Sequence, residues 1–357
     1  MTLGLLLPLL VYAFVLVLHL VIPARWVDGY VTDPATGRPL RYRLNGLRVF
    51  VVTIALYALG AERGLIPWDL FWVHRWAMAA GACALGLLFT LAIVLPARPR
   101  GGLGSDLYLG RLDNPQWGGG RIDAKMFLYL VGAVMLELNV LSFAAHHALR
   151  HPDDVSPGVL LYVVMFTFFL AEYLNFEEVH LYTYDFFAER VGFKLGWGCL
   201  VFYPFFYCVG LWAVAERPNP HTPKPLLALA LVLFFGGWLL ARGANLQKYF
   251  FKTAPERSFL GILQPVTVAG GGKQLLCSGF WRLSRHINYL GEISMAVGLT
   301  LALGWPLSPA PWLYPLYYLV LLVPRQHFDD QRCAAKYGAL WQEYCRRVPY
   351  RIVPWIY

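Results

Sequence analysis

Charged residues are scarce in this chain. They make up 14% of its 357 residues, whereas soluble domains average about 25%. Hydrophobic residues account for 58%, and the mean hydropathy is +0.50. The composition therefore excludes an ordinary soluble domain. Several apolar runs are long enough to cross a bilayer, so the sequence predicts a membrane protein with several spans.

Familiar catalytic and metal-binding motifs are also missing. The six cysteines are scattered without a CxxC pair, which argues against a disulfide framework or a zinc site. Neither GxSxG nor HExxH occurs, and we find no repeat or low-complexity segment. The single HxxxH motif, His147 and His151, is typical of membrane desaturases, but those enzymes need several such boxes. We expect no metal.

A glycine-rich run, "VAGGGK" at 268–273, is the nearest approach to a phosphate-binding loop. GxxxxGK[ST] is absent and no strand is expected before the run, so the pattern favours a flexible turn.

The net charge of +9 could indicate nucleic acid. In a membrane protein the distribution of charge matters more than its sum, and no nucleic-acid partner is expected.

The hydrophobic pattern predicts an all-α, polytopic membrane protein with about nine to ten transmembrane helices. The first run lacks a basic flank and a cleavage site, so it is expected to be a retained helix. We expect one integral membrane domain over 1–357, with substrate-side residues in 1–240 and a cofactor-binding half in 241–357. The predicted segments lie near 3–23, 46–61, 72–95, 126–143, 158–174, 193–214, 225–241, 289–305 and 310–324.

Basic residues are unevenly divided between alternate loops. With these spans, 25 of the 30 lysines and arginines fall on one side. The positive-inside rule then places the C-terminus in the cytoplasm, and nine spans would place the amino end on the opposite side. The expected location is the endoplasmic reticulum in a eukaryote or the inner membrane in a bacterium. Oligomeric state is not readable from the sequence.

Three polar clusters lie on the expected cytoplasmic side. In "ANLQKYFFK" (244–252), Asn245, Lys248 and Lys252 share a helical face. In "SRHINYLGE" (284–292), polar side chains crowd the mouth of an apolar helix. The tail places mixed charges on one helical stripe, which contains Arg325, Asp329, Arg332 and Lys336.

Together these clusters predict a basic pocket ringed with aromatic side chains. Arginines clamp phosphates and aromatic rings stack, so the pocket suits a phosphorylated, aromatic cofactor. Each cluster also has a structural interpretation: lysines reaching lipid headgroups, a salt-bridge network, or a solvated amphipathic tail.

A fourth cluster, "AEYLNFEEVHLYTYDFF" at 171–187, is expected within the membrane. Glu178, Tyr182 and Asp185 share one helical face. Carboxyl groups and tyrosines in such surroundings are candidate proton donors to an apolar substrate. An ordinary charged loop is the alternative.

The sequence resembles the sterol reductases that reduce double bonds at C14, C7 or C24, a family that includes the membrane domain of the lamin B receptor. The resemblance runs from about residue 44 to the end. Its two most specific stretches are "GFWRLSRHINYLGE" (279–292) and "RCAAKYGALWQEYCRRVPYRIVPWIY" (332–357). Shorter stretches are "NGL" (45–47), "GRLDNP" (110–115), "DAKMF" (123–127), "LSFAAH" (141–146), "EEVHLYTYDFF" (177–187) and "NLQKYFFK" (245–252).

The resemblance implies an NADPH pocket and a sterol or related polycyclic isoprenoid as substrate. Position by position, the pocket falls on Lys248, Lys252, Arg282, His286, Asn288, Tyr289, Arg325, Asp329, Lys336 and Tyr337. Lys252 stands where many members carry arginine, and Ile287 where they carry proline. Phe176 and Cys199 differ from the residues that family members often carry in the part of the site expected to bind the sterol. These differences concern which double bond is reduced more than whether NADPH is used.

The expected reaction protonates one alkene carbon and delivers hydride to the other. The candidate acids are Tyr173 or Tyr182 supported by Glu178, with Asp329 at the cytoplasmic end. Reduction at C14 is the first choice, then C24 or C7. The alternatives are an isoprenylcysteine methyltransferase-like enzyme that binds S-adenosylmethionine, and a non-catalytic sterol-binding protein.

Overall fold

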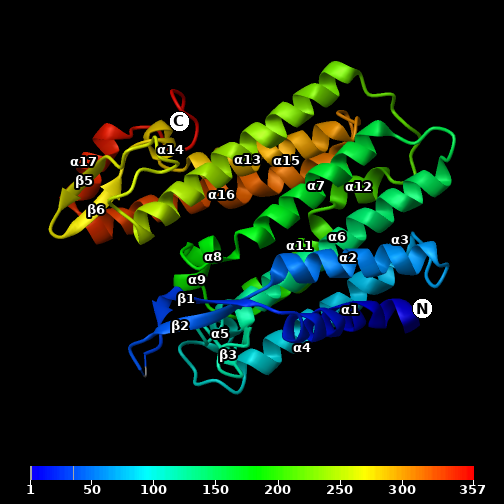
Figure 1. Ribbon diagram of the computed structural model, residues 1–357, viewed down its shortest axis with the longest axis horizontal. Coiled ribbons are helices and arrows are strands. Elements are labelled where there is room, and N and C mark those ends of the chain that lie inside the picture. The colour runs from blue at the N-terminus through cyan, green and yellow to red at the C-terminus, as the bar shows by residue number, and fades with distance from the viewer. Residues whose placement is uncertain (1, 35) are drawn as a thin grey trace. The chain divides into compact units, whose positions relative to one another are not determined.

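The computed structural model describes residues 2–34 and 36–357. Most of the chain is helical, and it forms two compact units, Met1–Asn219 and Pro220–Tyr357 (Figure 1). Residue 240, where the sequence was divided into two halves, lies inside a continuous helix of the second unit.

In the first unit, α6 (Ala124–Arg150) is the central helix, and its apolar stretch is largely buried. Asp123 caps it by accepting hydrogen bonds from the backbone amides of Lys125 and Met126, both at 3.0 Å. The other helices of this unit are α1 (Thr2–Val21), α2 (Gly46–Glu62), α3 (Leu70–Val73), α4 (Arg75–Val94), α5 (Leu103–Leu109), α7 (Pro157–Asn175), α8 (Glu177–His180), α9 (Tyr184–Phe187), α10 (Phe193–Trp197), α11 (Tyr203–Phe206) and α12 (Val209–Val214).

The span expected at 193–214 is helical but irregular. Between α10 and α11 the chain widens into a π-helix, η1 (Gly198–Phe202). Pro204, two residues after it, has no backbone N–H, so the regular hydrogen-bond ladder is broken here. The missing N–H leaves the Leu200 carbonyl without its helical donor, and this carbonyl accepts a hydrogen bond from Tyr12 Oη on α1. The Pro204 carbonyl accepts one from Asn139 Nδ2 on α6 at 2.8 Å. Buried side chains thus satisfy the irregular backbone.

The chain is mostly helical, as the all-α prediction requires, and three short antiparallel hairpins interrupt the helices among the described residues. They are β1 (Arg25–Thr32) with β2 (Pro39–Leu44), β3 (Gln116–Trp117) with β4 (Ile122–Asp123), and β5 (Thr267–Gly270) with β6 (Lys273–Leu276). The glycine-rich run forms the tip of the third hairpin. It is the expected turn, but a strand does precede it, contrary to the prediction.

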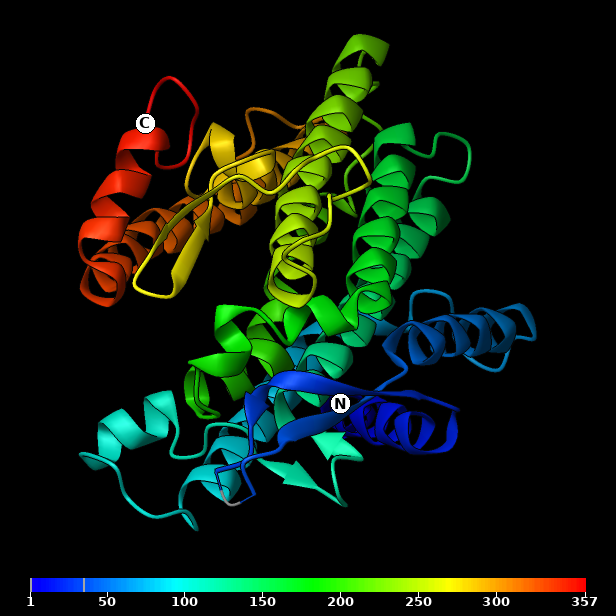
Figure 2. The same cartoon turned by 60° about the vertical axis from the view of Figure 1, so that its left-hand side comes forward.

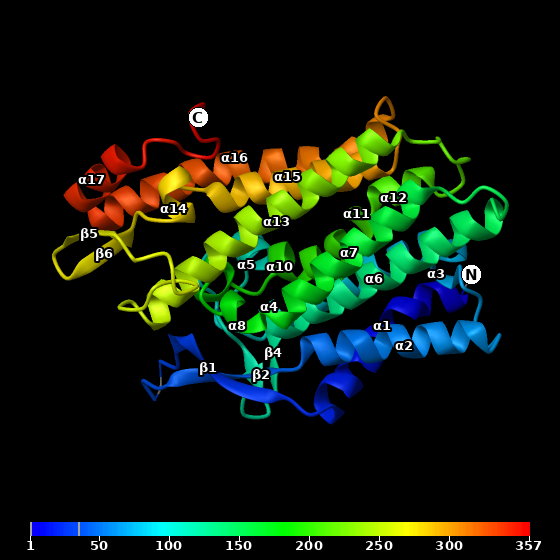
Figure 3. The same ribbon diagram turned by 45° about the horizontal axis from the view of Figure 1, so that its top comes forward.

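The second unit is built on three helices that run side by side: α13 (Lys224–Thr253), α15 (Ile287–Ala302) and α16 (Pro309–Tyr337) (Figures 1 and 3). The short helices α14 (Phe280–Leu283) and α17 (Ala339–Arg347) complete it. Figure 2 shows the yellow hairpin β5–β6 beside the orange and red helices α16 and α17.

Small residues let α13 and α15 approach closely. A Cβ atom added to Gly291 would lie 2.5 Å from the carbonyl oxygen of Gly237, and one added to Gly298 would lie 2.7 Å from that of Ala230. Close backbone contact at small residues is a typical way for helices to associate in a membrane.

Each of the nine predicted hydrophobic segments lies on helical structure. Among the described residues, six helices are long and apolar enough to cross a membrane: α1, α4, α6, α7, the segment Phe193–Val214, and α13. The other three segments fall short for separate reasons. Helices α2 and α15 have 17 and 16 residues, and the second half of α16 is rich in charged residues.

Candidate functional site

All ten residues of the predicted cofactor pocket belong to the second unit, and most of them lie near one end of its helices. The carboxyl end of α13, the start of α15 and the carboxyl half of α16 lie together at that end (Figure 3). The residues come from α13 (Lys248 and Lys252), α14 (Arg282), the start of α15 (His286, Asn288 and Tyr289) and α16 (Arg325, Asp329, Lys336 and Tyr337).

The end of α13 is fixed by contacts to the segment before α15. Gln247 is buried, donates to the carbonyl oxygen of Ser278 at 3.1 Å and accepts from the amide of Phe280 at 3.0 Å. Gly279 has a φ of +60° and packs on Gln247 so closely that a Cβ atom would lie 2.4 Å from the Gln247 amide. The Trp281 indole donates to the Ala244 carbonyl at 2.9 Å. These contacts hold "NLQKYFFK" and "GFWRL" together.

Three lysines of this end are exposed residues whose charges act on one another: Lys248, Lys252 and Lys336. Lys248 Nζ also lies 5.2 Å above the Trp281 ring. Like charges gathered in this way repel one another, and an anion placed among them relieves the repulsion. The cluster is therefore a candidate site for phosphate groups.

Polar groups of α15 and α16 meet beside this cluster. Tyr289 Oη donates to Asp329 Oδ2 at 2.9 Å. The His286 ring stacks on the Tyr289 ring, with centroids 4.9 Å apart and planes at 24°. Asn288 Nδ2 lies 3.5 Å from Asn245 Oδ1, whereas the buried side-chain oxygen of Asn288, Oδ1, has no hydrogen-bond partner among the described residues. A buried acceptor without a partner is costly, so this atom is suited to a ligand donor.

The remaining predicted residues lie around this core. Arg282 is exposed on α14, and Arg325 is half-buried on α16. Lys336 Nζ lies 5.1 Å from the centroid of the Tyr337 ring, and Lys273 Nζ on β6 lies 5.6 Å from it. Lys273 Nζ also donates to the Lys336 carbonyl at 2.7 Å. The glycine-rich hairpin is thereby attached to the end of α16.

Sequence reasoning missed Asp330, which has more charged neighbours than Asp329. Its carboxylate meets Arg285 at 3.5 Å, His286 at 3.7 Å and Arg351 at 3.7 Å. The helical stripe through Arg325 and Asp329 leaves out the next residue, and the partner Arg351 is distant in sequence. The i, i+4 pair with Gln326, at 2.8 Å, was the available local signal.

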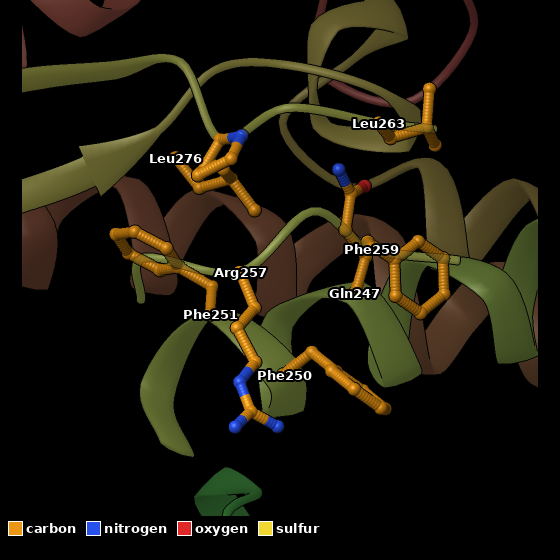
Figure 4. Close-up of a pocket in the computed structure, with 8 residues that line it drawn as sticks. Gln247, Phe250, Phe251, Arg257, Phe259, Leu263 and Leu276 are labelled. Atoms are coloured by element: carbon orange, nitrogen blue, oxygen red, sulfur yellow. The ribbon is translucent and has the colours of Figure 1, made fainter. Parts of the chain in front are cut away.

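A small cleft lies at the end of α13, between Phe250, Phe259 and Leu276 (Figure 4). Its empty space is about 210 Å³, part of it open to solvent, which is below the roughly 300 to 1,000 Å³ of small-molecule sites. Figure 4 shows the Arg257 guanidinium beside Phe250 and directed away from Leu263 and Leu276. None of the ten predicted residues lines this cleft, so it is not the candidate cofactor site.

The first unit holds the predicted proton-donor residues. Tyr173 is half-buried on α7; its ring stacks on His180, with centroids 3.9 Å apart. Its carbonyl oxygen lies 3.1 Å from His180 Nε2. The Tyr129 ring on α6 lies 6.1 Å from the Tyr173 ring. The following segment is anchored by the fully buried Lys125, whose Nζ donates to the carbonyls of Asp185 and Phe186 at 3.0 and 2.9 Å.

The two adjacent glutamates of this region have different surroundings. The side chain of Glu178 is 29% exposed and forms an ion pair with Arg25 of β1. Glu177 is buried and accepts a hydrogen bond from the amide of Gly46, at the start of α2, at 2.9 Å. Burial raises the pKa of Glu177 to about 7. Burial, and then the charge of Glu178, raise the pKa of Tyr182, so this phenol keeps its proton at neutral pH.

Glu137 on α6 is a further buried acid that sequence reasoning missed. It is fully buried, and its Oε1 accepts a hydrogen bond from Thr167 of α7 at 2.6 Å. It sits in the middle of an apolar helix, and a lone carboxyl group there is itself the signal that could have found it.

The histidines of the HxxxH motif are engaged by backbone groups. His147 Nδ1 lies 3.2 Å from the Ala215 carbonyl, and His147 Nε2 accepts from the Ser156 amide at 3.1 Å. His151 Nε2 lies 3.2 Å from the Glu216 carbonyl. These contacts join the end of α6 to the chain around α12, which is a structural role.

Fold and site together define a helical membrane protein whose second unit carries a cluster of lysines beside aromatic side chains. The model of the Ergosterol biosynthesis ERG4/ERG24 family matches residues 4–357, so the chain belongs to this family. This confirms the resemblance drawn from the motifs.

Relatives named Delta(14)-sterol reductase match along most of the chain. The protein of Arabidopsis thaliana is 32% identical over 378 residues, covering 100% of this chain and 99% of the relative. The protein of Mus musculus is 35% identical, covering 89% and 77%. The protein of Methylotuvimicrobium alcaliphilum is 31% identical, covering 90% and 76%.

Proposed function

We propose that this protein is an NADPH-dependent reductase of a carbon–carbon double bond in a sterol, with the C14 double bond as the first choice and C24 or C7 next. Membership of the ERG4/ERG24 family and the names of the relatives support the reaction class. The observation that carries the choice of cofactor is the lysine cluster beside the unpartnered oxygen of Asn288.

The residues of the second unit fit a phosphorylated dinucleotide. Lys248, Lys252 and Lys336 would hold its phosphates, because three exposed lysines attract polyanions. The Asn288 oxygen would accept from an amide or a hydroxyl of the ligand. The stacked rings of His286 and Tyr289 offer an aromatic surface. When bound, NADPH supplies the hydride.

The protein must also supply a proton, because an isolated alkene does not accept hydride directly. Tyr173 and Tyr182, with Glu178 nearby in sequence, remain our candidate acids in the first unit. The Tyr182 phenol is protonated at neutral pH, as a proton donor must be, and its raised pKa means that another group must assist the transfer. In the second unit, Asp329 accepts the hydrogen bond of Tyr289, which orients that phenol.

We further propose a topology of nine to ten spans, in which α2, α15 and the apolar half of α16 join the six long apolar helices. The C-terminus and the cofactor pocket face the cytoplasm, because that arrangement places 25 of the 30 basic residues inside. The membrane is the endoplasmic reticulum in a eukaryote or the inner membrane in a bacterium.

The test is turnover of purified protein in detergent with NADPH and a panel of C14-, C7- and C24-unsaturated sterols, with products identified by mass spectrometry. We expect one sterol to gain two mass units. Lys248→Gln should raise the KM for NADPH by about tenfold, the effect of losing one charge-assisted phosphate contact. Lys224→Gln is the matched control, since Lys224 starts the same helix about 36 Å away.

The alternatives predict other results. Methyl transfer from S-adenosylmethionine without NADPH oxidation would indicate the methyltransferase. Saturable sterol binding without any turnover would indicate a non-catalytic sterol-binding protein. Either result would contradict the proposed function.

A further inference from the structure

The carboxylate of Asp330 joins three segments that are separate in sequence. Asp330 lies on α16, and its Oδ2 accepts a hydrogen bond from Gln326 of the same helix at 2.8 Å. Arg285 and His286, just before α15, approach it at 3.5 and 3.7 Å. Arg351, from the tail after α17, approaches it at 3.7 Å. One anion thus faces cations from two other segments.

Most of this contact is shielded from water. The side chains of Arg285, His286 and Asp330 are 8%, 12% and 15% exposed, whereas that of Arg351 is 41% exposed. Burial alone would raise the pKa of Asp330, but the nearby side chain of His286 and the charges of Arg285 and Arg351 lower it below its ordinary value. Asp330 is therefore ionised at neutral pH. Its loss would leave the Arg285 charge buried without this counter-ion, which is strongly destabilising.

The tail and the segment before α15 also run together through their backbones. The amide of Arg285 donates to the Tyr350 carbonyl at 2.9 Å, and the amide of His286 donates to the Arg351 carbonyl at 2.8 Å. Ser284 Oγ donates to the Ile352 carbonyl at 2.8 Å. The ion pairs of Asp330 therefore strengthen a contact between the tail and the segment before α15 that backbone hydrogen bonds also form.

From these contacts we propose that Asp330 is a positioning residue for the cofactor pocket. Its carboxylate fixes residues 284–289 against α16 and the tail. The His286 ring, whose Nε2 lies 3.7 Å from Asp330 Oδ1, stacks on Tyr289, and Tyr289 donates to Asp329. The carboxylate therefore sets the arrangement in which Asn288 and Tyr289 meet the ligand. The effect on cofactor binding rests on the proposed function, whereas the effect on residues 284–289 does not.

The test compares Asp330→Asn, Asp330→Glu and the control Glu343→Gln, which removes an acid of α17 paired with Arg346 and Arg347. Two quantities are measured on the full chain in detergent. The first is hydrogen–deuterium exchange of peptides covering 284–292, with peptides of α13 as internal reference. The second is the dissociation constant of NADPH, with kcat and KM where turnover is found.

We expect Asp330→Asn to speed exchange over 284–289 and to weaken NADPH binding by about tenfold, with kcat at saturating NADPH changed less than threefold, because the residue orders the pocket without touching the reacting atoms. Asp330→Glu, which keeps the charge, should recover most of both effects, and Glu343→Gln should show neither. If Asp330→Asn does not fold, Arg351→Gln removes the exposed partner and should give the same pattern, more weakly.

Three results would contradict the proposal. One is unchanged exchange over 284–289 in Asp330→Asn. Another is faster exchange throughout the second unit, which would mean a general structural role. The third is faster exchange over 284–289 in Asp330→Asn with NADPH affinity still within twofold of the unsubstituted protein. If the unsubstituted protein binds no NADPH, the proposed function and the cofactor part of the proposal both fail, and the exchange measurement still decides the positioning role.

Discussion

At the scale of single residues, Glu177 and Glu178 show how neighbouring identical side chains acquire different properties. Glu178 faces Arg25 and remains partly in water. Glu177 is buried under the start of α2, where its partner is a backbone amide. Helical spacing favours Glu178, because this residue shares a helical face with Tyr182. Chain bending at α8 and α9, which the sequence does not reveal, decides which acid is buried.

The raised pKa of Glu177 predicts a loss of stability with rising pH. Between its ordinary value of 4.5 and about 7, the folded protein holds a proton that the unfolded chain has released. Raising the pH through this range therefore costs up to about 3 kcal/mol, and the loss persists above pH 7. Glu177→Gln, which is neutral throughout, should flatten the fall in Tm between pH 5 and 8. Glu178→Gln should leave that slope unchanged. Equal slopes in all three proteins would contradict the assignment.

Lys252 offers a second prediction at this scale. It stands where many family members carry arginine, whose planar fork binds a phosphate through two hydrogen bonds. Lys252→Arg should therefore tighten NADPH binding by about threefold and leave NADH, which lacks the 2'-phosphate, unchanged. Isothermal titration with both nucleotides measures the ratio. A parallel gain for NADH would show that Lys252 does not lie at the 2'-phosphate.

At the scale of elements, the site depends on how closely α13 and α15 pack. A Cβ atom at Gly237 would lie 2.6 Å from the Gly291 carbonyl and 2.9 Å from the Met295 amide, and both are backbone atoms that cannot rotate away. The adjacent Gly236 has no such neighbour within 4 Å. The two glycines therefore form a matched pair on one helix.

Gly237→Ala should separate α13 from α15 and lower stability by about 2 kcal/mol, in the range of overpacked cores. NADPH binding should weaken with it, because Lys248 and Asn288 lie on the two separated helices. Gly236→Ala should be neutral or slightly stabilising, because alanine favours a helix over glycine. Thermal unfolding of both variants measures the difference. Similar Tm values for the two would contradict the close packing.

The helices could be predicted from the sequence and the first hairpin could not, and the difference has physical reasons. Long apolar runs predict the helices, because a helix in the core or in the membrane is surrounded by apolar groups over its whole surface. The hairpin β1–β2 was missed because its strands mix arginines with aromatics, and only one face is covered by residues such as Phe186. Helical spacing grouped Asp329 with Lys336 correctly on α16. It could not bring Arg351 to Asp330, because that contact depends on the path of the tail.

At the scale of the whole molecule, the distribution of basic residues predicts which loops face the cytoplasm. Gly271, at the tip of the hairpin β5–β6, and Asp153, in the turn between α6 and α7, should lie on opposite sides of the membrane. Gly271→Cys and Asp153→Cys can be treated with an impermeant maleimide in sealed vesicles, with the unsubstituted chain as background. We expect labelling of Gly271→Cys only from the cytoplasmic side and of Asp153→Cys only from the other. Labelling of both from one side would contradict the topology.

The central claim is that one hydrogen of the reduced bond comes from NADPH as hydride and the other from the protein as a proton. The most direct measurement uses NADPH carrying deuterium at the transferred position and a C14-unsaturated sterol, with product mass determined in H2O and in D2O. The account predicts that the product gains one deuterium from the cofactor in H2O, and one from solvent when unlabelled NADPH is used in D2O. A product with no deuterium from the cofactor, or no reduced sterol from any substrate in the panel, would contradict it.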